Sequence, residues 1–407
     1  MNRYRSLMAI LAILHVNSCK PIAHNQQSLQ STPNLLTGAD QTEKYLPLLI
    51  GKRIGILANP TTVIGQTHLV DSLQKLGIQI VKVFGPEHGF RGNASAGAKV
   101  SDEIDPVTGI PVISLYGSKS KPSKEDLPDI DLMIYDLQDV GCRFYTNINA
   151  LARLMEACAE NNKELLILDR PNPNGYFIDG PVLDMKLKSG IGMFPIPISH
   201  GLTIGEFAQM VNGEGWLANK EKCKITIISV ANYSHVMPYT LPVKPSPNLN
   251  TQQSILLYPS LCLFEGTMIS QGRGTYFPFS VLGNPDLQNV YTFSFTPTSI
   301  KGMAETPLHM NKPCYGLDLR KYDLPILKKL KQINISWMIE LYKAYPYKEK
   351  FFDYKQSKEM GNIDKLVGTT EFKEQIIAGV SETEIRKSWE PGLSAFKEKR
   401  KKYLLYP

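Results

Sequence analysis

Residues 132–169 read LMIYDLQDVGCRFYTNINALARLMEACAENNKELLILD. This stretch begins with the apolar run LMIY and ends with the apolar run ELLIL, and each run has the length of a buried strand. Between them, NINALARLMEACAENNK repeats apolar residues every three or four positions, as an amphipathic helix does. Two apolar strands joined through a helix are typical of a parallel sheet with helices on its faces. We therefore predict an α/β fold.

The same alternation of strands and helices extends on both sides of this stretch. It continues in RIGILAN (53–59), THLVDSLQKLG (67–77), IQIVKVF (78–84), PVISLYG (111–117), TIGEFAQMVNGEGWL (203–217) and KITIISV (224–230). We predict a parallel-sheet domain over residues 45–240. Prolines then interrupt both the helical and the strand periodicity in MPYTLPVKPSPNLNT, residues 237–251. After this segment the pattern changes to short strands mixed with helices. This segment is the predicted boundary to a smaller mixed α/β domain, residues 250–407.

Length and charge limit the class of protein that this sequence can encode. A chain of 407 residues is long enough for two domains, and 43% hydrophobic with 20% charged residues is typical of a globular protein. The formal net charge is +7, but the basic residues are scattered apart from KEKRKK at 397–402. We therefore expect no nucleic acid partner, and the charge modestly favours an acidic ligand.

The amino terminus has the layout of an export signal. MNRYRSLMAILAILHVNSC, residues 1–19, places basic residues before an apolar run that is too short to cross a membrane. The cysteine at its end resembles the lipidated first residue of a bacterial lipoprotein, so we expect a lipid anchor on Cys19 and a polar tether over residues 20–44. An ordinary cleaved secretory signal is the alternative, and both predict a protein outside the cytoplasm.

Cysteine and histidine spacing gives no support for a metal or a cofactor. The other five cysteines are widely spaced without a C-x-x-C pair, which favours buried apolar roles, and the seven histidines form no H-E-x-x-H motif. No glycine-rich phosphate-binding loop follows a strand. We predict no metal site and no nucleotide cofactor.

Reactive side chains follow three of the predicted strands. Ligands of an open parallel sheet bind beyond the carboxyl ends of its strands, so these side chains are expected at one rim. Each acidic residue taken alone is more often a helix cap or turn former. The group comprises Glu87, His88, Asp136, Asp139, Arg143, Asp169, Arg170 and Asn172.

Five motifs in order carry a family resemblance. FGPEHGFRG, DLQDVGCRFYT, LDRPNPNG, SHGLTIGE and FEGTMISQGRGT resemble the exo-β-N-acetylmuramidase family typified by NamZ, long known as a domain of unknown function. The resemblance runs from about residue 50 to the end of the chain. It implies a Rossmann-like domain, a smaller carboxyl-terminal α/β domain and an active-site cleft between them. It also implies removal of non-reducing N-acetylmuramic acid from peptidoglycan fragments, in cell-wall turnover or recycling.

Glycoside hydrolysis usually takes two carboxyl groups, and the sequence offers candidates for both. Glu87, in a tight turn after a strand, is our candidate for the general acid, and a structural glutamate is the alternative. Glu265 is the candidate for the second carboxylate, unless the acetamido group of the substrate takes that role. Arg273, between Gly272 and Gly274, is the candidate partner of the muramic acid carboxylate, because flanking glycines allow close approach of a ligand.

Further residues are candidates for binding the substrate. Asp136 and Asp139 would orient sugar hydroxyls, or form an internal ion-pair network with Arg143. Asp169 and Asn172 are stiffened by two prolines and would present fixed hydrogen-bonding groups, or only shape the turn. The remaining candidates are His88, Tyr145 and His200, the last just before a predicted capping box of Thr203 and Glu206.

Two other classes of protein stay open at this point. A non-catalytic muropeptide-binding lipoprotein would use the same cleft without cleavage. An esterase ranks last, because no G-x-S-x-G motif occurs. The sequence leaves the stereochemical outcome, the required glycan length, the membrane face and the oligomeric state open.

Overall fold

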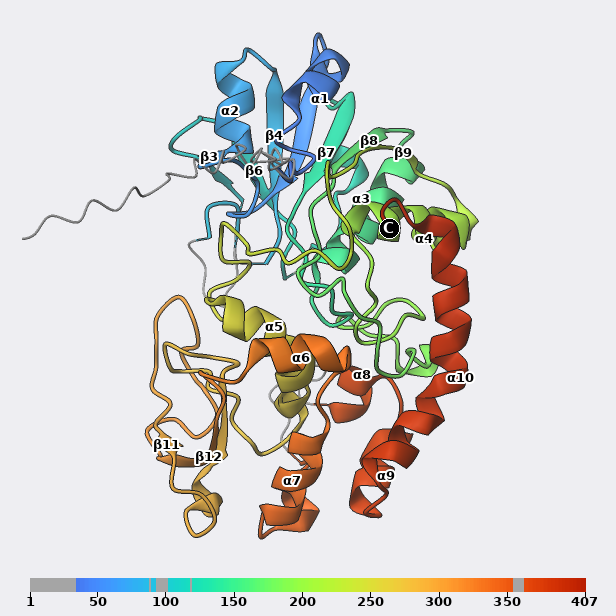
Figure 1. Ribbon diagram of the computed structural model, residues 1–407. Helices are drawn as coiled ribbons and strands as arrows, with labels where there is room; N and C mark the ends of the chain where they lie inside the picture. The colour runs from blue at the N-terminus through green and yellow to red at the C-terminus, as the bar shows by residue number, and fades with distance from the viewer. Residues whose placement is uncertain (1–33, 88, 93–101, 118, 354–361) are drawn as a thin grey trace, which may run out of the picture. The chain divides into compact units, whose positions relative to one another are not determined.

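A seven-stranded sheet forms the amino-terminal half of the protein in a computed structural model that describes residues 34–87, 89–92, 102–117, 119–353 and 362–407 (Figure 1). The strand order is β5-β6-β4-β1-β7-β8-β9. All neighbours from β6 to β9 pair in parallel, and only the edge strand β5 is antiparallel. The predicted parallel sheet is thus confirmed. Its strands are β1 (Ile54–Ala58), β4 (Ile80–Gly85), β5 (Glu103–Ile104), β6 (Pro111–Ser114), β7 (Leu132–Asp136), β8 (Glu164–Leu168) and β9 (Lys224–Ile228).

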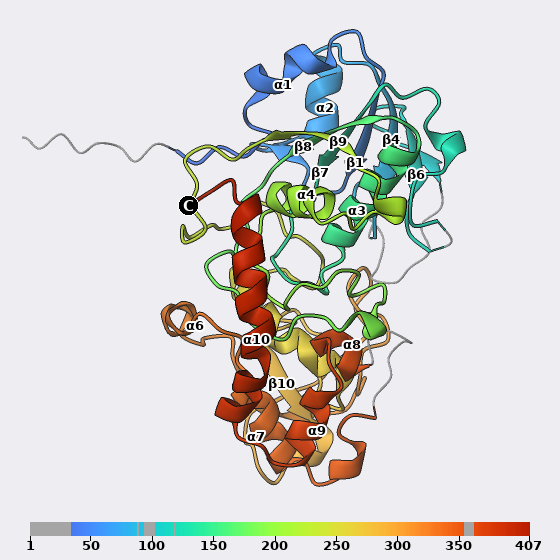
Figure 2. The same ribbon diagram turned by 90° about the vertical axis from the view of Figure 1, so that its right-hand side faces the viewer.

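Alternating side chains of the central strands face two separate cores. Leu132 and Ile134 of β7 pack with helices α1 (Thr42–Leu49) and α2 (Leu69–Lys75). Met133 and Tyr135 pack on the other face with α3 (Asn147–Glu160) and α4 (Ile204–Gly213). Figures 1 and 2 show these helix pairs on opposite faces of the sheet. A strand buried on both faces must be apolar throughout, which explains the run LMIY.

The end of the predicted tether is part of the fold. Of residues 20–44, those from Leu35 onward pack on the sheet domain, and α1 already begins at Thr42. Leu36 pairs with Ala231, and the Gln41 side chain donates to the Ser229 carbonyl over 2.7 Å. These contacts place the end of the predicted tether within the fold, because a polar composition does not reveal pairing with a distant segment.

The carboxyl-terminal half combines helices with a small antiparallel sheet of order β10-β12-β11. Its core also contains Val140, Cys142 and Phe144 from the loop after β7. The rim of the first sheet and the second domain therefore share one apolar core. The elements are α5 (Gln252–Leu261), β10 (Val281–Asn284), β11 (Ser294–Phe295), β12 (Cys314–Asp318), α6 (Leu324–Leu330), α7 (Ser336–Ala344), α8 (Ile363–Val367), α9 (Glu371–Ile377) and α10 (Glu382–Arg400), and a hairpin of β2 (Val63–Ile64) and β3 (Thr67–His68) lies in the first half.

The last helix returns to the first domain. Trp389 and Leu393 of α10 pack in the core of the second half, whereas Phe396 packs in the α3 and α4 core. Figure 2 shows α10 running the length between the two halves. The chain then ends against the sheet domain, where Tyr406 is buried.

The described cysteines, Cys142, Cys158, Cys223, Cys262 and Cys314, are all free and buried, as their spacing predicts. In the part of the chain that the structure covers, no helix is both long and apolar enough to span a membrane. The predicted lipidation residue Cys19 lies outside the described residues.

Candidate active site

Glu87 lies at the carboxyl end of β4, in the turn that the sequence predicts. The turn is closed by a hydrogen bond of 2.9 Å from the Gly89 amide to the Pro86 carbonyl. Glu87 is half-buried and hydrogen-bonds to Tyr116, which follows the neighbouring parallel strand β6. Burial, followed by the charge and hydrogen bond of Glu87, raises the pKa of Tyr116 to about 12. His88 lies outside the described residues.

Tyr145 joins the rim of the sheet to the second domain. Its hydroxyl donates to the Pro245 carbonyl over 2.7 Å, and its ring contacts Tyr258 of α5 edge-on with centroids 6.0 Å apart. Burial, and then the charges of Asp139 and Glu87, raise its pKa. The Tyr145 hydroxyl therefore links the loop after β7 to the segment that precedes α5.

Asp139 is buried beside His200 at this rim. Only 4% of Asp139 is exposed, and its Oδ2 accepts a hydrogen bond of 2.7 Å from the Gly141 amide. Its Oδ1 has no partner among the described residues, and neither has Nε2 of His200, which lies 3.8 Å from Asp139 Oδ2. Burial raises the pKa of Asp139 to about 7 and lowers that of His200 to about 3. At neutral pH the imidazole of His200 is therefore neutral, and the neighbouring Asp139 carboxyl group is near the midpoint of its titration.

Glu265 and Arg273 bind each other within the second domain. Arg273 Nε donates to Glu265 Oε1 over 2.6 Å, and Gln271 donates to the same oxygen over 3.0 Å. Only 1% of Glu265 is exposed. The sequence predicts a free guanidinium on Arg273, but its Nε is already hydrogen-bonded to Glu265.

The glycines beside Arg273 are required by the backbone. Gly272 and Gly274 have φ values of 83° and 81°, in the left-handed region that side chains disfavour. A Cβ on Gly272 would lie 2.7 Å from Val281, and one on Gly274 would lie 2.5 Å from Pro307. The loop thus presents Arg273 in one fixed conformation.

An aromatic row connects the rim of the sheet domain to the ion pair of Glu265. Tyr258 contacts Tyr145 on one side and Phe279 on the other, with centroids 5.0 Å apart in the second pair. The Arg273 guanidinium lies 5.1 Å from the Phe279 ring centroid. The row runs from Tyr145, in the loop after β7, to the ion pair of Arg273 with Glu265, so the structure brings motifs from both domains to one region.

Asp136 and Arg143, two residues predicted to bind the substrate, form their hydrogen bonds with other groups of the protein. Arg170 holds both oxygens of Asp136, at 2.5 and 2.8 Å, so the partner of this aspartate is Arg170 and not Arg143. Arg143 is fully buried and donates to the carbonyls of four residues, Pro181, Ile196, Leu366 and Val367, over 2.6–2.9 Å. It ties the rim loops to α8, and its Nε, which has no hydrogen-bond partner among the described residues, is buried away from the surface.

Asp169 and Asn172 are also engaged internally. Asp169 is fully buried and accepts hydrogen bonds from Tyr406, Thr203 and Gly205 over 2.6–2.8 Å. Burial raises its pKa to about 6. The Asn172 side chain donates to the Leu202 carbonyl and accepts from the Asn174 amide. For Asp169 and Asn172, these bonds favour the alternative that they only shape the turn. Thr203 and Glu206 form the predicted capping box of α4.

Sequence reasoning missed Tyr116 and Tyr258. Neither stands in one of the five motifs, and both are placed by contacts between elements far apart in the sequence. Proximity of β6 to β4 in the strand order is the signal that points to Tyr116.

Comparisons with known proteins agree along nearly the whole chain. The family model described as exo-β-N-acetylmuramidase NamZ, N-terminal, matches residues 54–253, and its C-terminal counterpart matches residues 256–406. The peptidoglycan β-N-acetylmuramidase NamZ of Bacillus subtilis (strain 168) is 37% identical, over 96% of this chain and 95% of that protein.

Two crystal structures of DUF1343 family proteins from Bacteroides fragilis NCTC 9343 are similar in fold. One is 45% identical with a TM-score of 0.84, and the other is 30% identical with a TM-score of 0.77. Each similarity covers 92% of this chain and 99% of the solved chain.

Proposed function

Because the chain belongs to the exo-β-N-acetylmuramidase NamZ family, we propose that it is an exo-acting glycoside hydrolase. It releases N-acetylmuramic acid from the non-reducing ends of peptidoglycan fragments, in cell-wall turnover or recycling. The observation that carries this proposal is the match to a peptidoglycan β-N-acetylmuramidase over 96% of the chain, with both family domains present.

The site geometry supports Glu87 as the general acid. It is half-buried at a strand end and hydrogen-bonded to a tyrosine. A carboxylic acid in this position would protonate the glycosidic oxygen as the bond to the sugar breaks.

Glu265 remains our candidate for the second carboxylate. Its charge is balanced by Arg273 and it lies at the far end of the aromatic row from Tyr145. A bound substrate would have to compete with Glu265 for Arg273. The lactyl carboxylate of muramic acid is an anion and can compete for the guanidinium. The acetamido oxygen of the substrate is the other group able to take the nucleophile's role.

The test of the activity is a pair of disaccharides that differ in the terminal sugar. The protein is incubated with a muramic-acid-terminated disaccharide and with a glucosamine-terminated control, and released monosaccharide is followed by mass spectrometry. Release of N-acetylmuramic acid from the first substrate alone is expected. Saturable binding of the first substrate without release would instead identify a muropeptide-binding protein.

Export with a lipid anchor on Cys19 is part of the proposal. It is supported by the basic and apolar leader that ends at this cysteine. Expression in a bacterium with a labelled fatty acid should label the protein, and Cys19→Ala should abolish the label and release the protein from membranes. Label retained in Cys19→Ala would contradict the anchor.

A further inference from the structure

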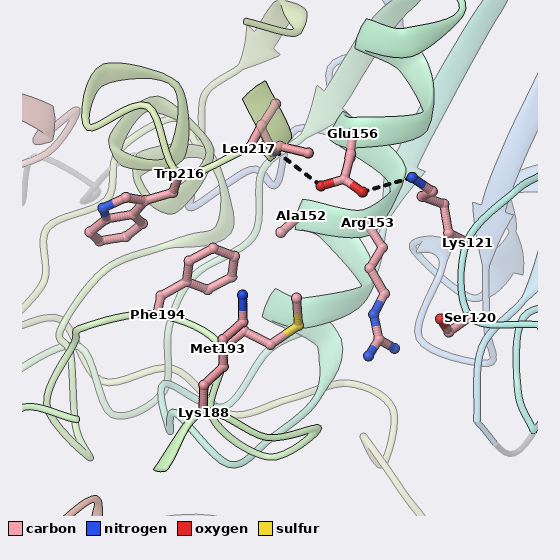
Figure 3. Close-up of a pocket in the computed structure, with 11 residues that line it drawn as sticks. Ser120, Lys121, Ala152, Arg153, Glu156, Lys188, Met193, Phe194, Trp216 and Leu217 are labelled. Carbon is pink, nitrogen blue, oxygen red and sulfur yellow. Dashed lines mark hydrogen bonds and ion pairs between the residues drawn. The ribbon is translucent and has the colours of Figure 1, made fainter. Parts of the chain in front are cut away.

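A cavity of about 340 Å³ lies on the sheet domain, between α3 and the segment after α4 (Figure 3). Its lining includes no residue of the candidate active site. Three cations, Lys121, Arg153 and Lys188, stand in its wall against one carboxylate, Glu156. The cavity is therefore electropositive.

The carboxylate in this wall is already neutralised. Glu156 accepts a hydrogen bond of 2.7 Å from Lys121 and one of 3.2 Å from the Ala218 amide, as the dashed lines in Figure 3 show. Burial opposes ionisation of Glu156, but these two hydrogen bonds hold its pKa below the usual value. Lys121 is also bound to Glu160, so these three side chains form a closed charge cluster.

Arg153 and Lys188 have no acidic partner within ion-pair distance among the described residues, and the charge of Lys188 acts on Glu156 only from farther away. Within the described ranges, the side chains of both residues make no hydrogen bond and no ion pair. Figure 3 shows the guanidinium of Arg153 directed away from Glu156. A guanidinium with its donors unused can bind a carboxylate through two parallel hydrogen bonds, and an ammonium elsewhere in the lining of the same cavity can add another charge-assisted bond.

The opposite wall is apolar and rigid. Phe194 stacks on Trp216 with ring centroids 5.3 Å apart, and its edge is packed against Phe207. Met193 and Ala152 complete this side of the cavity. A ligand that fits both walls must carry an acid group on a short, partly apolar chain.

We propose that this cavity is a second ligand site, which binds a carboxylate of the muropeptide through Arg153 and Lys188 and packs the adjoining apolar part on Phe194. The inference rests on the proposed function for the identity of the ligand. Peptidoglycan offers this chemistry in two places, the amino-acid stem and the lactyl group of muramic acid. The size of the apolar wall favours the stem.

Direct binding to the whole protein separates these sources. The probes are the dipeptide L-alanyl-γ-D-glutamate, free N-acetylmuramic acid, N-acetylglucosamine as a neutral control and acetate as a simple anion, each titrated by NMR. The variants are Arg153→Gln and Lys188→Gln, with Lys186→Gln as the matched control on an exposed lysine outside the cavity. Glutamine keeps the helix propensity of α3, and circular dichroism with a melting curve verifies the fold of each variant.

The dipeptide should bind, and its dissociation constant should rise at least tenfold in Arg153→Gln and remain unchanged in Lys186→Gln. A loss of N-acetylmuramic acid binding in place of dipeptide binding would support the site with the lactyl group as its ligand. Equal dipeptide binding in Arg153→Gln and Lys186→Gln would overturn the proposal. So would displacement of the dipeptide by acetate at equal concentration, since that identifies a site for any small anion.

The two proposals fail separately. Turnover of the disaccharide is measured on the unaltered protein, whereas the second site is measured by binding to variants without any turnover. Turnover with no effect of Arg153→Gln on binding refutes the second site alone.

Discussion

Arg273 Nε lies 2.6 Å from Glu265 Oε1, so the two residues expected to meet the substrate from the second domain bind each other. The Glu265 side chain is fully buried and that of Arg273 is 15% exposed. If one of the two charges is removed, the other stays buried and water cannot solvate it in place of the lost partner.

Breaking this pair should destabilise the protein more than removing it. Glu265→Gln and Arg273→Gln should each lower the free energy of unfolding by about 3–5 kcal/mol, and the double variant should lose less than the sum. Urea unfolding of all four proteins measures the coupling. The exposed pair Asp318 and Arg320 is the control, where Arg320→Gln should cost about 1 kcal/mol or less. Additive losses at Glu265 and Arg273 would contradict the ion pair.

Asp139 should make stability depend on pH. Burial raises its pKa to about 7 in the folded protein, whereas an unfolded aspartate has a pKa of about 3.9. The folded chain therefore retains a proton that the unfolded chain has lost. This stabilisation is fully present below about pH 4 and is lost as the pH rises through about 7.

Asp139→Asn removes this titration while it keeps an acceptor for the Gly141 amide. Relative to Asp139→Asn, the unaltered protein should lose a few kcal/mol of unfolding free energy between about pH 4 and pH 7. Asp169, with a pKa of about 6, titrates in both proteins and cancels in the difference. Urea unfolding at a series of pH values gives this difference, and a constant value across the range would be inconsistent with a raised pKa.

The carboxyl terminus should contribute to stability through Tyr406. Its hydroxyl donates to Asp169 over 2.6 Å and accepts from the Val230 amide over 2.8 Å. Tyr406→Phe leaves both groups without this partner in a buried place, which should cost about 1–3 kcal/mol of unfolding free energy. Tyr347→Phe, at a ring that is 46% exposed, is the matched control and should have little effect. Equal melting temperatures for the two variants would refute the role of Tyr406.

The sheet domain was predictable because its signals are local. β7, α3 and β8 appear in residues 132–169 as apolar runs and a helical period, and their order in the chain implies parallel pairing. The choice of partners within the site was not predictable. Asp136 binds Arg170 because parallel registration of β7 with β8 aligns the strand ends, whereas Arg143 is nearer in sequence.

The contacts of Asp169 show the same limit over a longer range. Its partner Tyr406 lies 237 residues away, and only the return of α10 to the sheet domain brings them together. Sequence spacing identified which loops carry polar residues, but burial decided which of those residues are structural and which remain near an open site.

We propose that Glu87 is the general acid in the release of N-acetylmuramic acid. The most direct test compares kcat for N-acetylmuramic acid release by Glu87→Gln with that by Glu103→Gln, a change at an exposed glutamate in the edge strand β5. We predict a loss of about 10²–10⁴-fold for Glu87→Gln at an unchanged melting temperature, and no loss for Glu103→Gln. A folded Glu87→Gln protein that keeps more than a tenth of the activity would contradict the account.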